Sequence, residues 1–146
     1  PGASVCFFSG AGVSRPAPTY SGYAASKTML LKMTELLDDE YPEDKFFIIG
    51  PGMVRTKIQQ QTLDAGLRAD NYSRVREFME SGDPIHGAGT SHDRIYACLK
   101  WCLQAPKEIV GGRNFYAPGL DWGVLMEHKL RTNRDLFKLR RFGGGL

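Results

Sequence analysis

The sequence predicts an α/β fold that is built on a parallel β-sheet. Three observations support this: short apolar runs end at glycine or proline, a helical apolar pattern separates the first two runs, and another precedes the third. Strands that are buried on both faces and alternate with helices pair in parallel. The 146 residues are expected to form one domain, because no linker and no internal repeat divides them.

The first half of the chain is expected to fold as strand, loop, helix and strand. Residues 4–9 and 45–49 are apolar enough for strands that are buried on both faces, and the glycines and prolines of 10–19 make a loop. The helix is expected over 20–37, with so wide an apolar stripe that little of it faces water. That stripe consists of Met29, Leu30, Met33, Leu36 and Leu37.

The second half adds helices and one more strand. Thr90 and Asp93 form a capping pair that starts a helix, and Pro106 ends it. The third strand is expected over 109–110 and 114–117. The apolar face of the helix has regular spacing: Ile95, Cys98, Leu99, Cys102 and Leu103. Three further helices are expected with less regular patterns: 55–65, 71–80 and 123–142.

Composition excludes several classes of protein. The chain is 42% hydrophobic, which is too apolar for a disordered chain, and three cysteines are too few for a disulfide scaffold. No run is long enough to span a membrane and no signal-peptide pattern is present, so we expect a cytoplasmic protein. The net charge of +3 indicates no nucleic-acid partner, and no membrane partner is expected either.

Polar residues capable of chemistry stand near the expected strand ends. Tyr23 and Lys27 are four residues apart, so they share one helix face, and a nearby ammonium lowers the pKa of a phenol toward the range of a general acid or base. Ser9 ends the first strand, at the sheet edge where ligands bind in open parallel sheets. The second strand ends at a turn over 51–56, where exposed amides and the Thr56 hydroxyl can meet a polar ring or a phosphate.

Three stretches together resemble the catalytic half of the short-chain dehydrogenase/reductase family. They are residues 5–12 (VCFFSGAG), 23–27 (YAASK) and 48–56 (IIGPGMVRT), in the order that the family has them. A weaker likeness continues to 112–116. The resemblance implies a Rossmann-like, doubly wound parallel sheet of which only the later strands and helices are present, with a substrate lid over 54–90.

The resemblance also implies an activity, an NAD(P)-dependent oxidoreductase that passes a hydride between the nicotinamide and a carbonyl or secondary alcohol. In that family the tyrosine exchanges the proton, the serine polarises the substrate oxygen, and the lysine lowers the tyrosine pKa and binds the nicotinamide ribose. These roles fall to Tyr23, Ser9 and Lys27. The cofactor, NAD or NADP, is expected against Tyr23, Lys27 and the turn residues Pro51, Gly52, Met53, Val54 and Thr56, and no metal is expected.

The partners follow from the same resemblance. The family's cofactor-binding half lies upstream of these motifs, and this chain begins with Pro1 instead of Met and enters an apolar run within a few residues. We therefore expect a further partner, which is either the missing N-terminal half of the same chain or a completing segment. It would supply the glycine-rich phosphate turn and would cover the open edge of the sheet. A small carbonyl or alcohol substrate and further copies of the chain, as a homodimer or homotetramer, are the other expected partners.

Two alternatives remain open. Extended members of the family, which are nucleotide-sugar epimerases or dehydratases, use the same Tyr-x-x-x-Lys pair, although little chain follows the turn to form their sugar-nucleotide region. A non-catalytic homologue is the other alternative, in which the helix over 20–37 serves an oligomer interface. Ser9, Tyr23 and Lys27 together count against it, because packing alone does not require all three.

Several further residues have a plain structural interpretation beside a functional one. Cys98 and Cys102 share a helix face, but their apolar neighbours favour core packing over a metal pair. His86 lies in the expected lid, where it could touch a substrate. Met53, Val54, Ile58 and Leu63 either line an apolar pocket or pack within the lid. A basic tail is expected to be a solvated helix face: Lys129, Arg131, Arg134, Lys138, Arg140 and Arg141.

Overall fold

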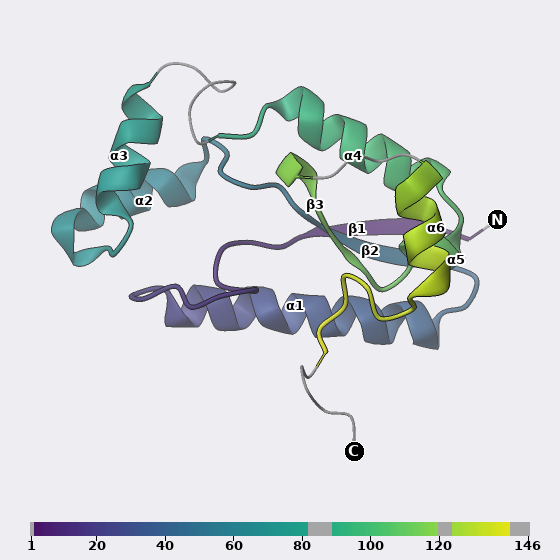
Figure 1. Cartoon of the computed structure of the whole chain (residues 1–146). Helices are drawn as coiled ribbons and strands as arrows, with labels where there is room; N and C mark the ends of the chain where they lie inside the picture. The colour runs from purple at the N-terminus through teal and green to yellow at the C-terminus, as the bar shows by residue number, and fades with distance from the viewer. Residues whose placement is uncertain (1, 82–88, 120–123, 141–146) are drawn as a thin grey trace.

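A computed structural model describes residues 2–81, 89–119 and 124–140 of the chain. The fold is α/β, with a three-stranded, all-parallel sheet in the order β1-β2-β3 (Figure 1). The strands are β1 (Ser4–Phe8), β2 (Lys45–Gly50) and β3 (Asn114–Tyr116). The helices of the described residues are α1 (Ser21–Glu40), α2 (Lys57–Ala65), α3 (Tyr72–Glu80), α4 (His92–Gln104), α5 (Lys107–Val110) and α6 (Val124–Thr132), with 3-10 turns η1 (Gly66–Arg68) and η2 (Ala117–Gly119).

The central strand β2 separates two layers of helices. Phe47 and Ile49 are fully buried on one face, in a cluster with residues of α4 and α6. Side chains alternate along a strand, so Ile48 faces the other side, where α1 lies (Figure 1). The predicted parallel pairing and the predicted second strand are therefore confirmed. No helix in the described ranges is long and apolar enough to cross a membrane.

The edge strand β1 differs from its predicted burial. Its side chains are half-buried or exposed, and Phe8 is 44% exposed, whereas burial on both faces was expected. The reason is its position: β1 pairs only with β2 among the described residues, so one long edge has no neighbouring strand. An apolar run shows that a strand is compatible with burial, but the neighbours decide how much of it is covered.

Helix α1 is present as predicted, but its apolar stripe is wider than the surface that covers it. It buries Leu31 and Thr34, while Met29 is 64% exposed and Leu36 is 48% exposed. The expectation that little of this helix faces water is wrong for the chain by itself. The sheet lies on one side of α1 (Figure 1), and the exposure of Met29 and Leu36 shows that it does not cover the whole stripe.

The segment before β3 is helical, not extended. Pro106 is the N-cap of the short helix α5, in which the Gly111 amide donates to the Lys107 carbonyl at 2.7 Å. Ile109 and Val110, predicted as part of the third strand, are fully buried in this helical turn. An apolar pair satisfies the core equally well in either conformation, and the proline start favours the turn. Residues 114–116 do form the predicted strand.

Other helix boundaries also differ from prediction. The α4 N-cap is Ser91, whose Oγ accepts from the Arg94 amide at 3.2 Å, whereas the Thr90 amide donates to the Met53 carbonyl. The tail helix α6 ends at Thr132, ten residues earlier than expected, because the Asn133 side chain accepts from the Asp135 amide at 3.0 Å and forms a turn there. Further along, Phe137 takes a φ of 64° that a helix cannot include. Two predicted helices are confirmed, as α2 and α3.

Two lysines tie the helices together at the end of the sheet where β2 begins. The Lys45 ammonium donates to three carbonyls at the end of α4, at 2.8–2.9 Å. The Lys107 ammonium donates to the carbonyls of Asp38, Tyr41 and Asp44, at the end of α1 and in the turn that leads to β2, at 2.5–2.8 Å. Each ammonium thereby satisfies backbone acceptors that the end of a helix leaves open.

At the opposite end of the sheet, α2, η1 and α3 form a helical arm, which we define as residues 57–80. The arm stands away from the sheet, beyond the end of β2 and above the start of α1 (Figure 1). It makes up most of the predicted lid. Residues 82–88, with His86, lie outside the described residues.

Candidate functional site

The three predicted catalytic side chains meet at the carboxyl end of β1. Ser9 directly follows this strand, and the Lys27 ammonium donates to the Phe8 carbonyl at 2.9 Å. The Tyr23 hydroxyl lies against the backbone of Gly10, so close that a Cβ on Gly10 would stand 2.0 Å from the phenol oxygen. Glycine at this position lets the tyrosine reach the strand end. The structure therefore brings Ser9, Tyr23 and Lys27 together around residues 8–10.

The electrostatics of Tyr23 differ from the prediction. Burial raises the pKa of Tyr23, so the expected lowering by Lys27 is wrong for the protein without a ligand. The Lys27 ammonium lies 5.8 Å from the centre of the Tyr23 ring and bonds to a backbone carbonyl. Within the described residues the Tyr23 hydroxyl has no hydrogen-bond partner. At neutral pH the phenol thus keeps its proton and can donate it.

Ser9 is engaged by a residue that sequence reasoning missed. Ser9 is only 4% exposed, and its hydroxyl donates to the side-chain oxygen of Asn114 at 3.0 Å. The two meet across β2 because Gly50 has no side chain there: a Cβ on Gly50 would lie 3.1 Å from the Ser9 oxygen. A glycine at the end of an otherwise apolar strand is the signal that could have suggested this contact. To donate to a ligand, the Ser9 hydroxyl must turn away from Asn114.

The turn after β2 is fixed mainly by other parts of the chain. Gly52 has a φ of 76°, and a Cβ there would stand 2.3 Å from the Thr90 hydroxyl, so glycine is required. The Thr56 hydroxyl donates to Gln59 at 2.6 Å and caps α2. In the described part of the chain, no hydrogen bond joins the turn to the residues at β1. Its predicted cofactor-binding residues Pro51, Gly52, Met53 and Val54 are half-buried.

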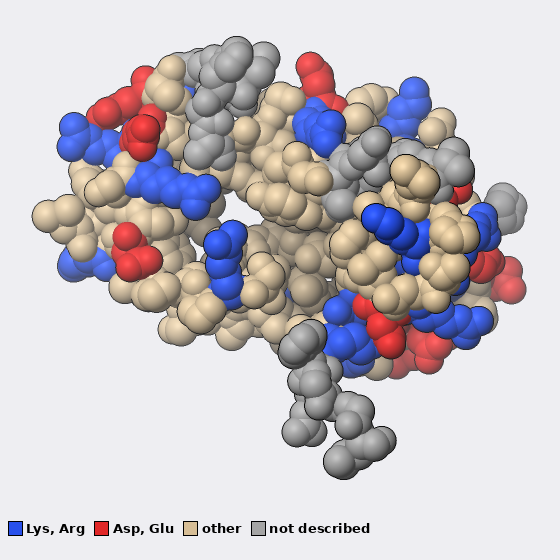
Figure 2. All heavy atoms as spheres, viewed as in Figure 1, with Lys and Arg blue, Asp and Glu red and all other residues tan. Residues whose placement is uncertain are grey.

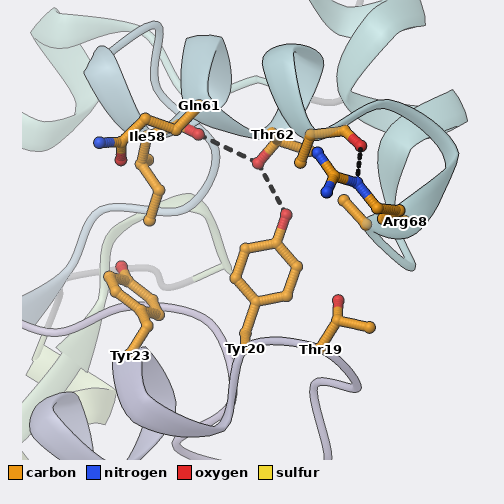
Figure 3. Close-up of a pocket in the computed structure, with 9 residues that line it drawn as sticks. Thr19, Tyr20, Tyr23, Ile58, Gln61, Thr62 and Arg68 are labelled. Carbon is orange, nitrogen blue, oxygen red and sulfur yellow. Dashed lines mark hydrogen bonds between the residues drawn. The ribbon is translucent and has the colours of Figure 1, made fainter.

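A pocket of about 520 Å³ opens between the start of α1 and the arm. Tyr20 and Tyr23 reach into it from α1 and its N-cap, and Ile58 and Thr62 face them from α2 (Figure 3). Arg68 of η1 completes the far side. The space-filling view shows the molecule hollowed between the arm and the sheet, with Lys and Arg side chains on the rim (Figure 2). Of the four predicted apolar lid residues, Ile58 lines this pocket.

Tyr20, which sequence reasoning also missed, connects α1 to the arm. Its hydroxyl donates to the Asn71 side-chain oxygen at 2.6 Å and lies 2.7 Å from the Thr62 hydroxyl. Its ring meets that of Tyr23 edge to face, with the centroids 6.5 Å apart. This contact orients the Tyr23 ring beside that of Tyr20 in the pocket wall.

The cysteines belong to the core. Cys98 and Cys102 are fully buried in the cluster between α4 and the sheet, which confirms the packing interpretation. Burial raises the pKa of Cys6 to about 12, so this thiol is a poor nucleophile. Among the residues that the structure describes, no three His, Cys, Asp or Glu side chains come together to hold a metal ion.

The arrangement at β1 has the parts for proton transfer to a ligand. A protonated phenol lies at the end of a parallel strand, near the Ser9 hydroxyl and the Lys27 ammonium. Of these three residues, Tyr23 lines the pocket, whereas Ser9 and Lys27 are not among its lining residues. The carboxyl edge of such a sheet is a common ligand-binding location. No protein-family model matches this chain, and no curated protein matches it significantly.

Proposed function

We propose that this protein is an NAD(P)-dependent oxidoreductase of the short-chain dehydrogenase/reductase type, acting on a carbonyl or secondary alcohol. The observation that carries the proposal is Tyr23: a phenol with no hydrogen-bond partner among the described residues, placed against Gly10 and open to the pocket. Ser9 directly follows β1, and the Lys27 ammonium donates to the carbonyl of the preceding residue, Phe8. This proximity supports the resemblance to that family.

The residues of this chain would move the proton. When bound, the nicotinamide supplies or accepts the hydride. Tyr23 donates its proton to the substrate oxygen as negative charge develops there, and its raised pKa keeps the phenol protonated at neutral pH, which is the form that carbonyl reduction requires. The Ser9 hydroxyl, after leaving Asn114, donates a second hydrogen bond to the same oxygen.

Lys27 has capacity left for a cofactor. An ammonium has three donors, and the Phe8 carbonyl takes one of them. The remaining donors suit the hydroxyls of a ribose beside Tyr23. The half-buried turn residues 51–54 would border the nicotinamide ring, while Thr56 retains its capping role at α2.

A completing segment is part of the proposal. The free edge of β1 and the exposed ring of Phe8 suit a further parallel strand, as in a doubly wound, Rossmann-like sheet. Such a segment would bring the glycine-rich turn that a pyrophosphate needs. The loop between β1 and α1 does not replace it, because it spans residues 9–20 and is far longer than that turn.

The first experiment combines cofactor binding with turnover. NADH and NADPH are titrated separately while their fluorescence is followed, and reduction of simple ketones is then measured with the one that binds. Tyr23→Phe should lower turnover about 10²- to 10⁴-fold with little change in cofactor affinity. Tyr96→Phe, at an exposed position on α4, is the matched control. Normal turnover by Tyr23→Phe would remove this residue from the mechanism.

A second candidate function is supported by the surface of α1. Met29 and Leu36 are large apolar side chains that remain exposed on this helix. A non-catalytic module that assembles through α1 would cover them in a dimer. A dimer that Met29→Lys dissociates, in a protein that binds neither dinucleotide, would favour this candidate over the oxidoreductase.

A further inference from the structure

The pocket between α1 and the arm has an unequal distribution of polar groups. Most of its wall is apolar or aromatic, from Tyr20, Tyr23, Ile58, Ala65 and Ala69. None of the lining residues is acidic, and Arg68 is the one cation among them. A ligand that fills this volume therefore contacts mainly carbon, and any charge it places near Arg68 must be negative.

The Arg68 side chain is held in place but not neutralised. Arg68 is an exposed residue, and its Nε donates to the Ala65 carbonyl at 3.2 Å, which places the guanidinium beside the end of α2. The two terminal nitrogens have no partner within the described ranges, and no carboxylate there forms an ion pair with Arg68. A guanidinium with its terminal N–H groups open matches the two oxygens of a carboxylate.

Tyr23 and Arg68 lie on opposite sides of the pocket, with Tyr20 between them (Figure 3). A substrate whose reacting carbon is beside Tyr23 thus directs its other end toward Arg68. A single guanidinium suits a carboxylate, whereas phosphate groups are usually held by several donors or by a helix N-terminus. We infer that this pocket selects an oxo acid or hydroxy acid, with an apolar chain or ring between the reacting carbon and the carboxylate.

The inference rests on the proposed function, in which a carbonyl is reduced with the help of Tyr23. The carbonyl carbon of the oxo acid accepts a hydride from a reduced nicotinamide dinucleotide, and the carbonyl π pair moves to the oxygen. That oxygen takes the proton of Tyr23, and water returns a proton to the phenol. The oxo acid becomes a hydroxy acid while the dinucleotide is oxidised, and the carboxylate at Arg68 is unchanged.

Binding can be tested without turnover. The probes are 4-phenylbutanoate and its neutral analogue 4-phenylbutanamide, measured by isothermal titration calorimetry. We expect the acid to bind more tightly, and Arg68→Gln to weaken acid binding about tenfold while leaving the amide unaffected. Arg68→Lys should keep part of the preference for the acid over the amide, because lysine retains the positive charge but cannot form the two parallel hydrogen bonds of a guanidinium. Arg74→Gln, an exposed arginine of α3, is the matched control.

Turnover separates this inference from the proposed function. Reduction of 4-oxo-4-phenylbutanoate and of its amide is measured with the dinucleotide that binds, in the wild type and in Arg68→Gln. Equal binding and equal turnover of acid and amide would overturn the inference while leaving the oxidoreductase intact. An acid preference that survives Arg68→Gln would also overturn it. Acid-selective binding through Arg68 without any nicotinamide-dependent reduction would instead refute the proposed function.

Discussion

The two ends of the sheet handle their polar groups in opposite ways. Where β2 begins, the ammonium groups of Lys45 and Lys107 each donate to three backbone carbonyls. Where β1 ends, in the part of the chain that the structure describes, the Tyr23 hydroxyl and the terminal nitrogens of Arg68 have no partner. The comparison indicates that one end is built to hold the helices together and the other retains donors for a ligand.

The difference has a physical basis. Hydrogen bonds to a charged donor stabilise the fold when they satisfy carbonyls that helix ends leave open. An unused donor contributes nothing to stability and persists without great cost only where water can reach it, as in an open pocket. Substitutions at the two ends should therefore affect different measurements.

The largest effect on stability is expected at Lys107. Lys107→Met removes the ammonium that donates to three carbonyls and lies 3.4 Å from the Asp38 carboxylate, so the free energy of unfolding should fall by about 2 kcal/mol. The Asp38 carboxylate and the Tyr41 carbonyl keep the amides of Phe46 and Asp44 as donors. Urea denaturation measures this directly. Lys100→Met, at an exposed position of α4, is the control, and Tyr23→Phe should change stability little. A larger loss from Tyr23→Phe than from Lys107→Met would break the comparison.

A smaller effect is expected from Glu35, on α1. The hydrogen bond from Arg140, with a contribution from Lys32, lowers the pKa of Glu35 from 4.5 to about 2. A carboxylate with a lowered pKa stabilises the fold above its unfolded pKa, and this contribution disappears as the pH falls from about 4.5 through 2. Glu35→Gln should therefore flatten the dependence of stability on pH in this window, by roughly 1 kcal/mol. An unchanged acid dependence in the variant would contradict this prediction.

The smallest effect on stability is expected at Gly50. The added Cβ of Gly50→Ala would stand 3.1 Å from the Ser9 hydroxyl and 3.4 Å from the Tyr116 ring, so both must move slightly. We expect a loss below about 1 kcal/mol. Turnover should decrease more clearly, because the Ser9 hydroxyl shifts relative to Asn114. Asn114→Ala gives a second measurement, since it frees Ser9 without crowding it, and unchanged turnover in both variants would exclude Ser9 from the site.

Much of the sheet was predictable from the sequence, because buried parallel strands have a distinctive composition. The apolar run before Gly50 predicted β2, and the helical spacing of Cys98 and Cys102 predicted the buried face of α4. Apolar pairs such as Ile109–Val110 were less informative, since burial suits a helical turn as well as a strand. The exposure of Met29 was not predictable, because it depends on which surfaces face α1.

The candidate site was predictable only in part. The four-residue spacing placed Tyr23 and Lys27 on one helix face, and the strand end placed Ser9 beside them. The pKa direction of Tyr23 was wrong, since burial is a property of the folded neighbourhood and not of spacing. Asn114 is 105 residues from Ser9 in sequence, so no local pattern identifies the pair, and Gly50 indicates only that side chains can meet across the end of β2.

The hydrogen bonds of Tyr20 have a consequence for the rate at which ligands leave. The wall of the pocket carried by the arm is held to α1 through the contacts of this phenol with Thr62 and Asn71. Outward movement of the arm must break both contacts before a bound molecule can escape past it. Weakening these contacts by Tyr20→Phe is therefore expected to shorten the time that a ligand stays in the pocket.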